Sequence, residues 1–208
     1  EDFIARSVRR SIKQVVTPKK GTGKSGLIFI DAGGQEVLER TAGVIKKDWI
    51  EVRMQVGLPA AGRTILGNEA FIMLCREIPE ITEQALLWEN IDQEACTHFV
   101  KCVENQESIK SQLDTSGIAA FMANGSVLPR QSGISDLPLT GASVVPFQTP
   151  ESLLTSFKVP NPLMNGETVI HGMGIPKGIT LIVGGGYHGK STVLKALERG
   201  VYYHIPND

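Results

Sequence analysis

The stretch "ITLIVGGGYHGKSTVLKALERG", residues 179–200, joins an apolar run to a glycine-rich loop and then to a segment with helical spacing. The run "TLIV" predicts a buried strand, and the apolar positions after the loop predict a helix. Between them, Gly184 is followed after four residues by Gly189, Lys190 and Ser191, the spacing of a phosphate-binding loop. Such a loop directs consecutive backbone N–H groups at a phosphate from a helix N-terminus. The sequence therefore predicts a nucleotide site here.

The candidate site residues fill one continuous loop. Lys190 is the catalytic candidate, because its ammonium would reach the β- and γ-phosphates, and the hydroxyl of Ser191 would bind Mg²⁺. ATP and Mg²⁺ are therefore the expected cofactors. The full set of predicted nucleotide contacts is Gly184, Gly185, Gly186, Tyr187, His188, Gly189, Lys190, Ser191 and Thr192.

A second glycine-lysine-serine stretch, "KKGTGKSG" at residues 19–26, fails the same test. Pro18 stands where the first glycine of the pattern would have to be. The stretch also precedes an apolar run instead of following one, so it presents no helix N-terminus to an anion. We therefore expect no nucleotide at residues 19–26.

The first 25 residues are basic, although the whole chain has a formal net charge of −1. Seven basic residues stand against two acidic ones, which gives this segment a local balance of +5. Clustered cations favour a nucleic-acid backbone, since sequence-independent affinity comes from such charges. A solvated helix face followed by an exposed loop is the alternative interpretation. The candidate RNA contacts are Arg9, Arg10, Lys19, Lys20 and Lys24.

The rest of the chain reads as a mixture of helices and strands. Residues 3–16 have helical spacing, residues 26–31 predict a buried strand, and residues 41–45 and 48–59 predict a strand pair. Residues 67–113 predict helices, with Pro79 at a helix start and the core-facing positions Phe71, Leu74, Ile81, Leu86, Phe99 and Val103. Short strands and turns are expected after Gly117. No apolar run approaches the roughly 18 residues of a membrane span, so no membrane partner is expected.

The cluster of proline, asparagine and glycine in "PNPLMNGE", residues 160–167, predicts a domain boundary. The fold class expected is mixed α/β. An α+β domain with a basic arm is predicted over residues 1–160, and a phosphate-loop nucleotide-binding domain begins at residues 161–208.

Four segments carry a family resemblance: "SGLIFIDAGGQEVLERTA", "VGLPAAGRTILG", "VPFQTPESL" and "GMGIPKGITLIVGGGYHGKSTVLKALERGVYYHIPND". Together they resemble the predicted ATPases of the ABC class, from about residue 21 to the end of the sequence. The resemblance implies that residues 161–208 begin an ABC-type domain. It also implies that the acidic strand, the signature loop and the switch histidine of that domain lie beyond Asp208. Turnover of ATP and a homodimer formed through this domain are expected of the full-length protein.

The family includes an RNA-binding mitochondrial member of the trypanosome kRNA-editing machinery. This resemblance implies RNA and an RNA-processing complex as partners, and a location in the mitochondrial matrix, with the cytoplasm as the alternative. Two other functions stay open from the residues alone. One is a scaffold that binds nucleotide without turnover, and the other is a phosphate-loop kinase for a small molecule.

Overall fold

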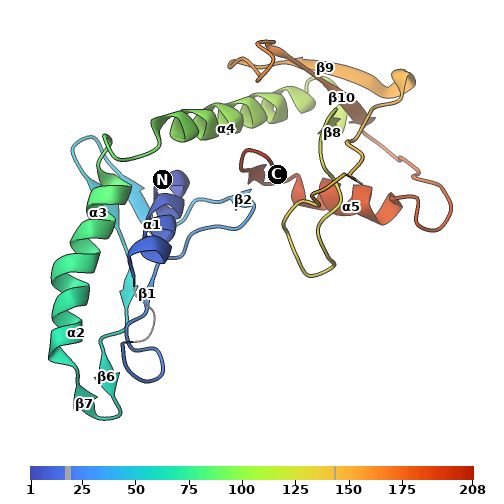
Figure 1. Ribbon diagram of the computed structural model, residues 1–208. Coiled ribbons are helices and arrows are strands. Elements are labelled where there is room, and N and C mark those ends of the chain that lie inside the picture. Colours follow the sequence, from blue (N-terminus) through green and yellow to red (C-terminus); the bar gives the residue numbers. More distant parts are fainter. Residues whose placement is uncertain (17–19, 143) are drawn as a thin grey trace. The chain divides into compact units, whose positions relative to one another are not determined.

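The computed structural model describes residues 1–16, 20–142 and 144–208. Its contacts divide it into two compact units, Glu1–Gly33 with Leu38–Thr97 and Gly34–Val37 with His98–Asp208. Both units combine helices and strands, so the mixed α/β class predicted from the sequence is confirmed (Figure 1). Within these described ranges, no helix has both the length and the apolar character that crossing a bilayer requires.

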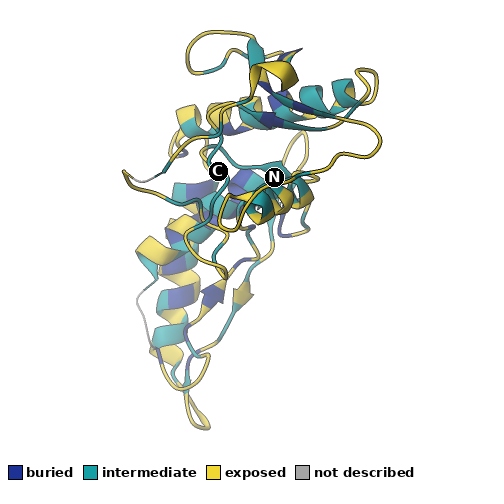
Figure 2. Cartoon of the chain, turned by 90° about the vertical axis from the view of Figure 1, so that its right-hand side faces the viewer, coloured by how far each residue is buried: buried dark blue, intermediate teal, exposed yellow. Residues whose placement is uncertain are grey.

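The core of the first unit lies between two helices and a short strand. Helix α1 (Asp2–Val15) turns Ala5 and Val8 inward, as the helical spacing of residues 3–16 predicted. Helix α3 (Ile78–Leu86) contributes Ile81 to the same cluster, and strand β1 (Ile28–Phe29) contributes Ile28. Figure 2 shows these buried faces in dark blue on helices whose opposite faces are exposed. The two helices thus bury one apolar stripe each, which is how an amphipathic helix gains most of its stability.

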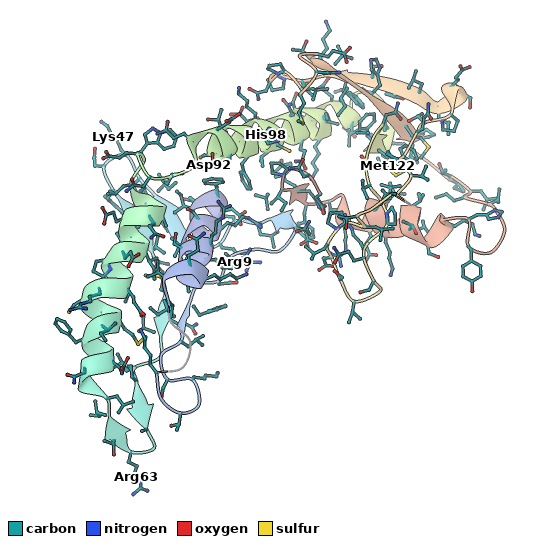
Figure 3. All side chains as sticks on the ribbon, viewed as in Figure 1. Arg9, Lys47, Arg63, Asp92, His98 and Met122 are labelled. Atoms are coloured by element: carbon teal, nitrogen blue, oxygen red, sulfur yellow. The ribbon has the colours of Figure 1, made fainter. Side chains whose placement is uncertain are left out.

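Three antiparallel strand pairs complete the first unit. The predicted pair is confirmed as β3 (Gly43–Ile45) with β4 (Ile50–Val52), joined through the turn that carries Lys47 (Figure 3). Strand β1 pairs with β5 (Gln55–Val56). The hairpin of β6 (Ala60–Ala61) and β7 (Thr64–Ile65) has Arg63 at its turn.

A π-helical turn interrupts the long helical stretch of this unit. Helix α2 (Gly67–Ile72) runs into the π-helix η1 (Met73–Glu77), which leads directly into α3 with Pro79 in its first turn, as predicted. The buried positions recur every fourth residue: Met73, Glu77, Ile81 and Ala85. Because a π-turn adds a residue to the helical repeat, the stripe falls out of phase with the α-helical pattern before it. The prediction that Phe71 and Leu74 face the core is therefore wrong, since both are exposed.

The second unit contains a three-stranded antiparallel sheet. Strand β10 (Val169–Pro176) lies between β8 (Ile118–Ala123) and β9 (Leu154–Lys158), and the 3₁₀-helix Glu151–Leu153 leads into β9. The rings of Phe121 and Phe157 meet edge to face at 5.0 Å between centroids. Helix α4 (Gln93–Leu113) buries Phe99 as predicted, and its residues from His98 onward belong to this unit.

A smaller strand pair joins distant parts of the sequence. Strand β2 (Glu36–Val37) pairs antiparallel with β11 (Tyr203–His204), just after helix α5 (Lys190–Arg199). The boundary that the sequence predicted at residues 160–167 falls between β9 and β10, which pair with each other. The division by contacts lies nearer Thr97.

The predicted strand at "TLIV" does not form. No strand is assigned between Pro176, where β10 ends, and Lys190, where α5 begins. The side chains of Ile179, Leu181 and Val183 are 103%, 83% and 75% exposed. A buried parallel strand requires neighbours that supply hydrogen bonds on its edges and apolar cover on its faces. The described residues supply neither at this position, so the apolar run stays extended and exposed.

Candidate nucleotide site

The glycine-rich loop ends at the N-terminus of α5. Gly189 is the N-cap of this helix and has a left-handed backbone with φ of 80°, a conformation that glycine adopts without a steric cost. Helix α5 starts at Lys190, which confirms the predicted order of loop and helix. The first backbone N–H groups of a helix have no partner within the helix. Those of Lys190, Ser191 and Thr192 are therefore available to an anion.

Two side chains fold back over the loop. The ammonium of Lys190 donates a hydrogen bond to the carbonyl oxygen of Gly185. The ring of His188 lies so close to Gly185 that a Cβ placed there would be 3.1 Å from its Cε1 atom. Lys190 is thus held at the loop before any ligand arrives, and a phosphate oxygen would have to replace the carbonyl as its partner.

The loop suits a nucleotide phosphate in charge and in backbone geometry. Among the described residues, the backbone N–H groups from Gly185 to Gly189 donate to no other backbone group. The positive end of the α5 dipole adds to the charge of Lys190. Ser191 is exposed in the first turn of α5, where its hydroxyl could bind the Mg²⁺ that accompanies ATP. The residues present therefore fit both groups.

Tyr187 adds a feature that the sequence pattern did not reveal. Its backbone has φ of 62°, which is rare for a residue with a side chain, and its ring is fully exposed. The loop pattern accepts any residue at this position, so the pattern gives no signal of that conformation.

A polar network lies beyond the C-terminal end of α5. Asp208 accepts hydrogen bonds from Arg130 at 2.5 Å and from Gln35 at 2.8 Å, and its carboxylate also contacts Nδ1 of His204. The other ring nitrogen of His204 lies 3.1 Å from the carbonyl oxygen of Arg199. This network was missed in the sequence, because its members come from positions up to 173 residues apart.

The contacts of this network shift two pKa values. The hydrogen bond with Asp208 raises the pKa of His204 and outweighs the opposing effect of burial. Burial acts to raise the pKa of Asp208, but the hydrogen bonds from His204, Gln35 and Arg130 together lower it. His204 is therefore more readily protonated, and Asp208 more readily ionised, than in an unfolded chain.

The predicted RNA-contacting residues are not all at the surface. Arg10 and Lys24 are exposed. Arg9 is half-buried on α1 and donates to the carbonyl oxygen of Ala32 at 2.9 Å, and burial lowers its pKa (Figure 3). Lys19 lies outside the described residues.

Lys20 requires a correction. Its side chain is 4% exposed and forms an ion pair with Glu77, which is itself buried on the π-helix. A charge count along the sequence cannot separate such a lysine from an exposed one, because the difference depends on a residue 57 positions away. Lys20 therefore cannot belong to an exposed basic surface.

The loop around Lys20 has a structural role in the first unit. The hydroxyl groups of Thr22 and Ser25 both donate to the carbonyl oxygen of Ala60, and the Thr22 N–H donates to the same oxygen at 2.9 Å. The loop precedes β1, as predicted, and is tied to the start of β6. It packs against protein groups and has no helix N-terminus to offer a phosphate.

Comparison with known protein families identifies both parts of the sequence. Residues 92–208, more than half of the chain, match the ABC-type ATPase family described as a P-loop domain. Residues 1–89 match the family described as the N-terminal part of ATPases of the ABC class. Comparison with curated proteins gave no match. The two family matches follow each other in the order that this architecture requires, and the chain belongs to the ABC-class ATPases.

Proposed function

We propose that the chain binds ATP with Mg²⁺ at residues 184–192 and couples the bound nucleotide to the handling of RNA. The observation that supports nucleotide binding is the position of Lys190. Its ammonium is held on the Gly185 carbonyl at the N-terminus of α5, beside backbone N–H groups without a backbone acceptor. An ATP-binding loop needs such preorganised donors, because they stabilise phosphate charge without further rearrangement.

The test is a comparison of two lysines on the same helix. We expect Lys190→Ala to weaken ATP binding at least tenfold, a loss of about 1.4 kcal/mol. Lys195→Ala is the matched control, since Lys195 is exposed one turn further along α5. Titration with a fluorescent ATP analogue in the presence of Mg²⁺ measures both variants. Equal affinities in the two variants would contradict the assignment of the loop.

The metal part of the proposal has its own measurement. Ser191→Ala removes the hydroxyl proposed to bind Mg²⁺ and leaves the phosphate-binding N–H groups in place. We expect this variant to lose the increase in affinity that Mg²⁺ gives to wild-type ATP binding, while its affinity in the presence of a chelator stays close to wild type. An unchanged response to Mg²⁺ would remove Ser191 from the proposed site.

Turnover in the full-length protein, a homodimer formed through the nucleotide domain and membership of an RNA-processing complex are further parts of this proposal. The resemblance described above supports them, together with a location in the mitochondrial matrix. Hydrolysis assays on the full-length protein and microscopy of a tagged form test turnover and location.

RNA binding is proposed through the residues of the basic segment that remain exposed. Arg10 and Lys24 keep their place as candidates, whereas the buried Lys20 does not. Because each lost phosphate contact releases fewer counterions, the double variant Arg10→Ala/Lys24→Ala should lower the slope of log affinity against log salt by roughly 0.7 to 0.9 per contact. Lys46→Ala/Lys47→Ala, in the exposed β3–β4 turn, is the control of equal charge. Equal slopes in both double variants would contradict this surface.

A further inference from the structure

A small pocket lies in the first unit, on residues that belong to neither the phosphate loop nor the basic segment. Its volume is about 210 Å³. Ala42 and Met54 supply apolar lining, and the partly exposed ring of Phe29 also lines it. Pockets for whole drug-sized ligands measure about 300–1,000 Å³. The size therefore suits a single ring system rather than a complete nucleotide.

The backbone around this pocket is fixed by strand pairing. Phe29 on β1 stands directly opposite Gln55 on β5 in the antiparallel register. The N–H of Arg53 donates to the carbonyl oxygen of Ala42 at 2.9 Å, which joins the segments on which these two residues lie. The pocket is thus formed in the absence of a ligand, as most small-molecule sites are.

The polar lining offers both donors and acceptors. Asp31 presents a carboxylate, which when ionised only accepts hydrogen bonds. Thr41 and Gln55 can each donate and accept, and the Arg53 guanidinium is a planar donor. A flat heterocycle with a polar edge would find partners at its edge and apolar or cationic surfaces at its faces.

The charges at the pocket are already paired. Asp31 binds Arg40 at 2.8 Å, and Arg53 binds Glu51 at 2.5 Å. The four side chains therefore sum to no net charge, which gives no reason for a phosphate or a charged peptide to bind here. An uncharged ligand is the best match.

We propose that this pocket, lined by Phe29, Asp31 and Arg53 among others, binds a nucleobase and prefers guanine. The preference follows from Asp31. Guanine presents two neighbouring N–H donors on its Watson–Crick edge, and both can be accepted by one carboxylate. Adenine presents a donor next to an acceptor, so its acceptor would face the carboxylate without a hydrogen. The base could belong to a free nucleoside or to single-stranded RNA, where unstacked bases are recognised on this edge.

The first experiment titrates the 208-residue chain with guanosine and with adenosine. Guanosine has no phosphate, so its binding does not depend on residues 184–192. We expect saturable binding of guanosine, at least tenfold tighter than that of adenosine. Asp31→Asn should lower guanosine affinity about tenfold and remove the preference. Asp48→Asn is the matched control, because Asp48 is exposed in the β3–β4 turn and does not line the pocket.

A second measurement needs no variant and guards against misfolding of Asp31→Asn. In ¹⁵N-labelled wild-type protein, guanosine should shift the amide signals of Thr41 and Gln55 and leave those of α5 unchanged. The proposal is overturned if guanosine shows no saturable binding up to about 1 mM, equivalent to only about −4.1 kcal/mol. Equal affinity for adenosine, or shifts outside the pocket only, would overturn it as well.

The source of the base is separated by two oligonucleotides, an all-uridine strand and the same strand with one central guanosine. If RNA supplies the base, the guanosine-containing strand binds more tightly, and Asp31→Asn removes the difference. If a free nucleoside is the ligand, guanosine binds while the two strands bind equally. The RNA arm alone rests on the RNA binding proposed above. ATP binding at residues 184–192 with no guanosine binding would therefore refute the pocket and leave the nucleotide proposal intact.

Discussion

Lys20 and Glu77 form an ion pair in which both side chains are almost fully buried, at 4% and 7% exposure. The pair joins the loop before β1 to the π-helix η1. Removing water from two charges is costly, and their attraction offsets that cost only while both partners are present. Loss of one partner would leave the other charge buried alone. The stability of the first unit therefore depends more on this lysine than on any exposed one.

Lys20→Ala should lower the free energy of unfolding by about 3–5 kcal/mol, the usual cost of breaking a buried ion pair. Lys24→Ala, four residues along the same loop, is the control, because Lys24 is exposed and its loss should change stability by no more than about 0.5 kcal/mol. Urea denaturation followed by circular dichroism measures both. If the two variants were equally stable, the ion pair would not contribute as described.

Strands β2 and β11 form a pair that polar side chains reinforce. Arg199, at the end of α5, binds Glu36 on β2 at 2.7 Å, and His204 on β11 contacts Asp208. Arg199 also binds Asp136 at 2.7 Å. A two-residue strand pair is too short to be stable by itself. These ion pairs and hydrogen bonds are what hold this part of the second unit together.

The stability that His204 contributes should depend on pH. Because its pKa is raised in the folded state, its contribution is complete below the ordinary histidine value and is lost as the pH rises through the raised pKa. Asp208 has a lowered pKa, so its contribution is present above the ordinary carboxyl value and is lost as the pH falls through the lowered one. Thermal melting of the second unit should therefore be most favourable between these limits.

Melting curves from about pH 4 to about pH 9, a range that spans both ordinary values, test this dependence. His204→Gln should flatten the fall in melting temperature on the alkaline side. His98→Gln, at an exposed position of α4 (Figure 3), should leave the wild-type profile in place. A wild-type profile in His204→Gln would show that the histidine contact is not the cause.

Elements governed by local pattern could be predicted from the sequence. Helix α1, the β3–β4 pair and the order of loop and α5 all follow from side-chain periodicity and turn residues within about 20 positions. The "TLIV" strand could not be predicted reliably, because an apolar run becomes a strand only where neighbouring strands receive it. The exposure of Phe71 was missed for another reason. No residue type marks the π-turn that changes the helical phase.

Contacts between distant residues were invisible at the sequence stage of reasoning for a physical reason. Which lysine is buried, or which aspartate accepts three partners, depends on packing between segments rather than on neighbours in the chain. The candidate nucleotide loop could be located because its chemistry is contained in nine consecutive residues. The pocket at Asp31 could not, since its lining comes from three separate segments.

At the scale of the whole molecule, the second compact unit is not continuous in sequence. It includes Gly34–Val37 as well as His98–Asp208, so strand β2 is supplied from the part of the chain that matches the N-terminal family. A fragment of residues 92–208 contains the full P-loop match but lacks β2, with Gln35 and Glu36. The family match and the folding unit therefore have different limits.

We expect the fragment 92–208 to melt less cooperatively, and at a lower temperature, than the second unit of the intact chain. Limited proteolysis should cut the fragment first near β11, which has lost its partner strand. The intact chain with Gln35→Ala and Glu36→Ala should be intermediate, because it keeps the backbone pairing but lacks the side-chain contacts. A fragment as stable and as protease-resistant as the intact chain would contradict this dependence.

The exposed run at residues 179–183 has a consequence for the protein in concentrated solution. Its five residues are uncharged, mostly apolar and β-branched, and free of proline, which is the composition of segments that stack into steric zippers. With a net charge of only −1, the chain has little electrostatic repulsion to oppose such stacking. Its shelf life is therefore set by this segment, and one lysine in place of Leu181 should delay fibril growth more than several charges added elsewhere.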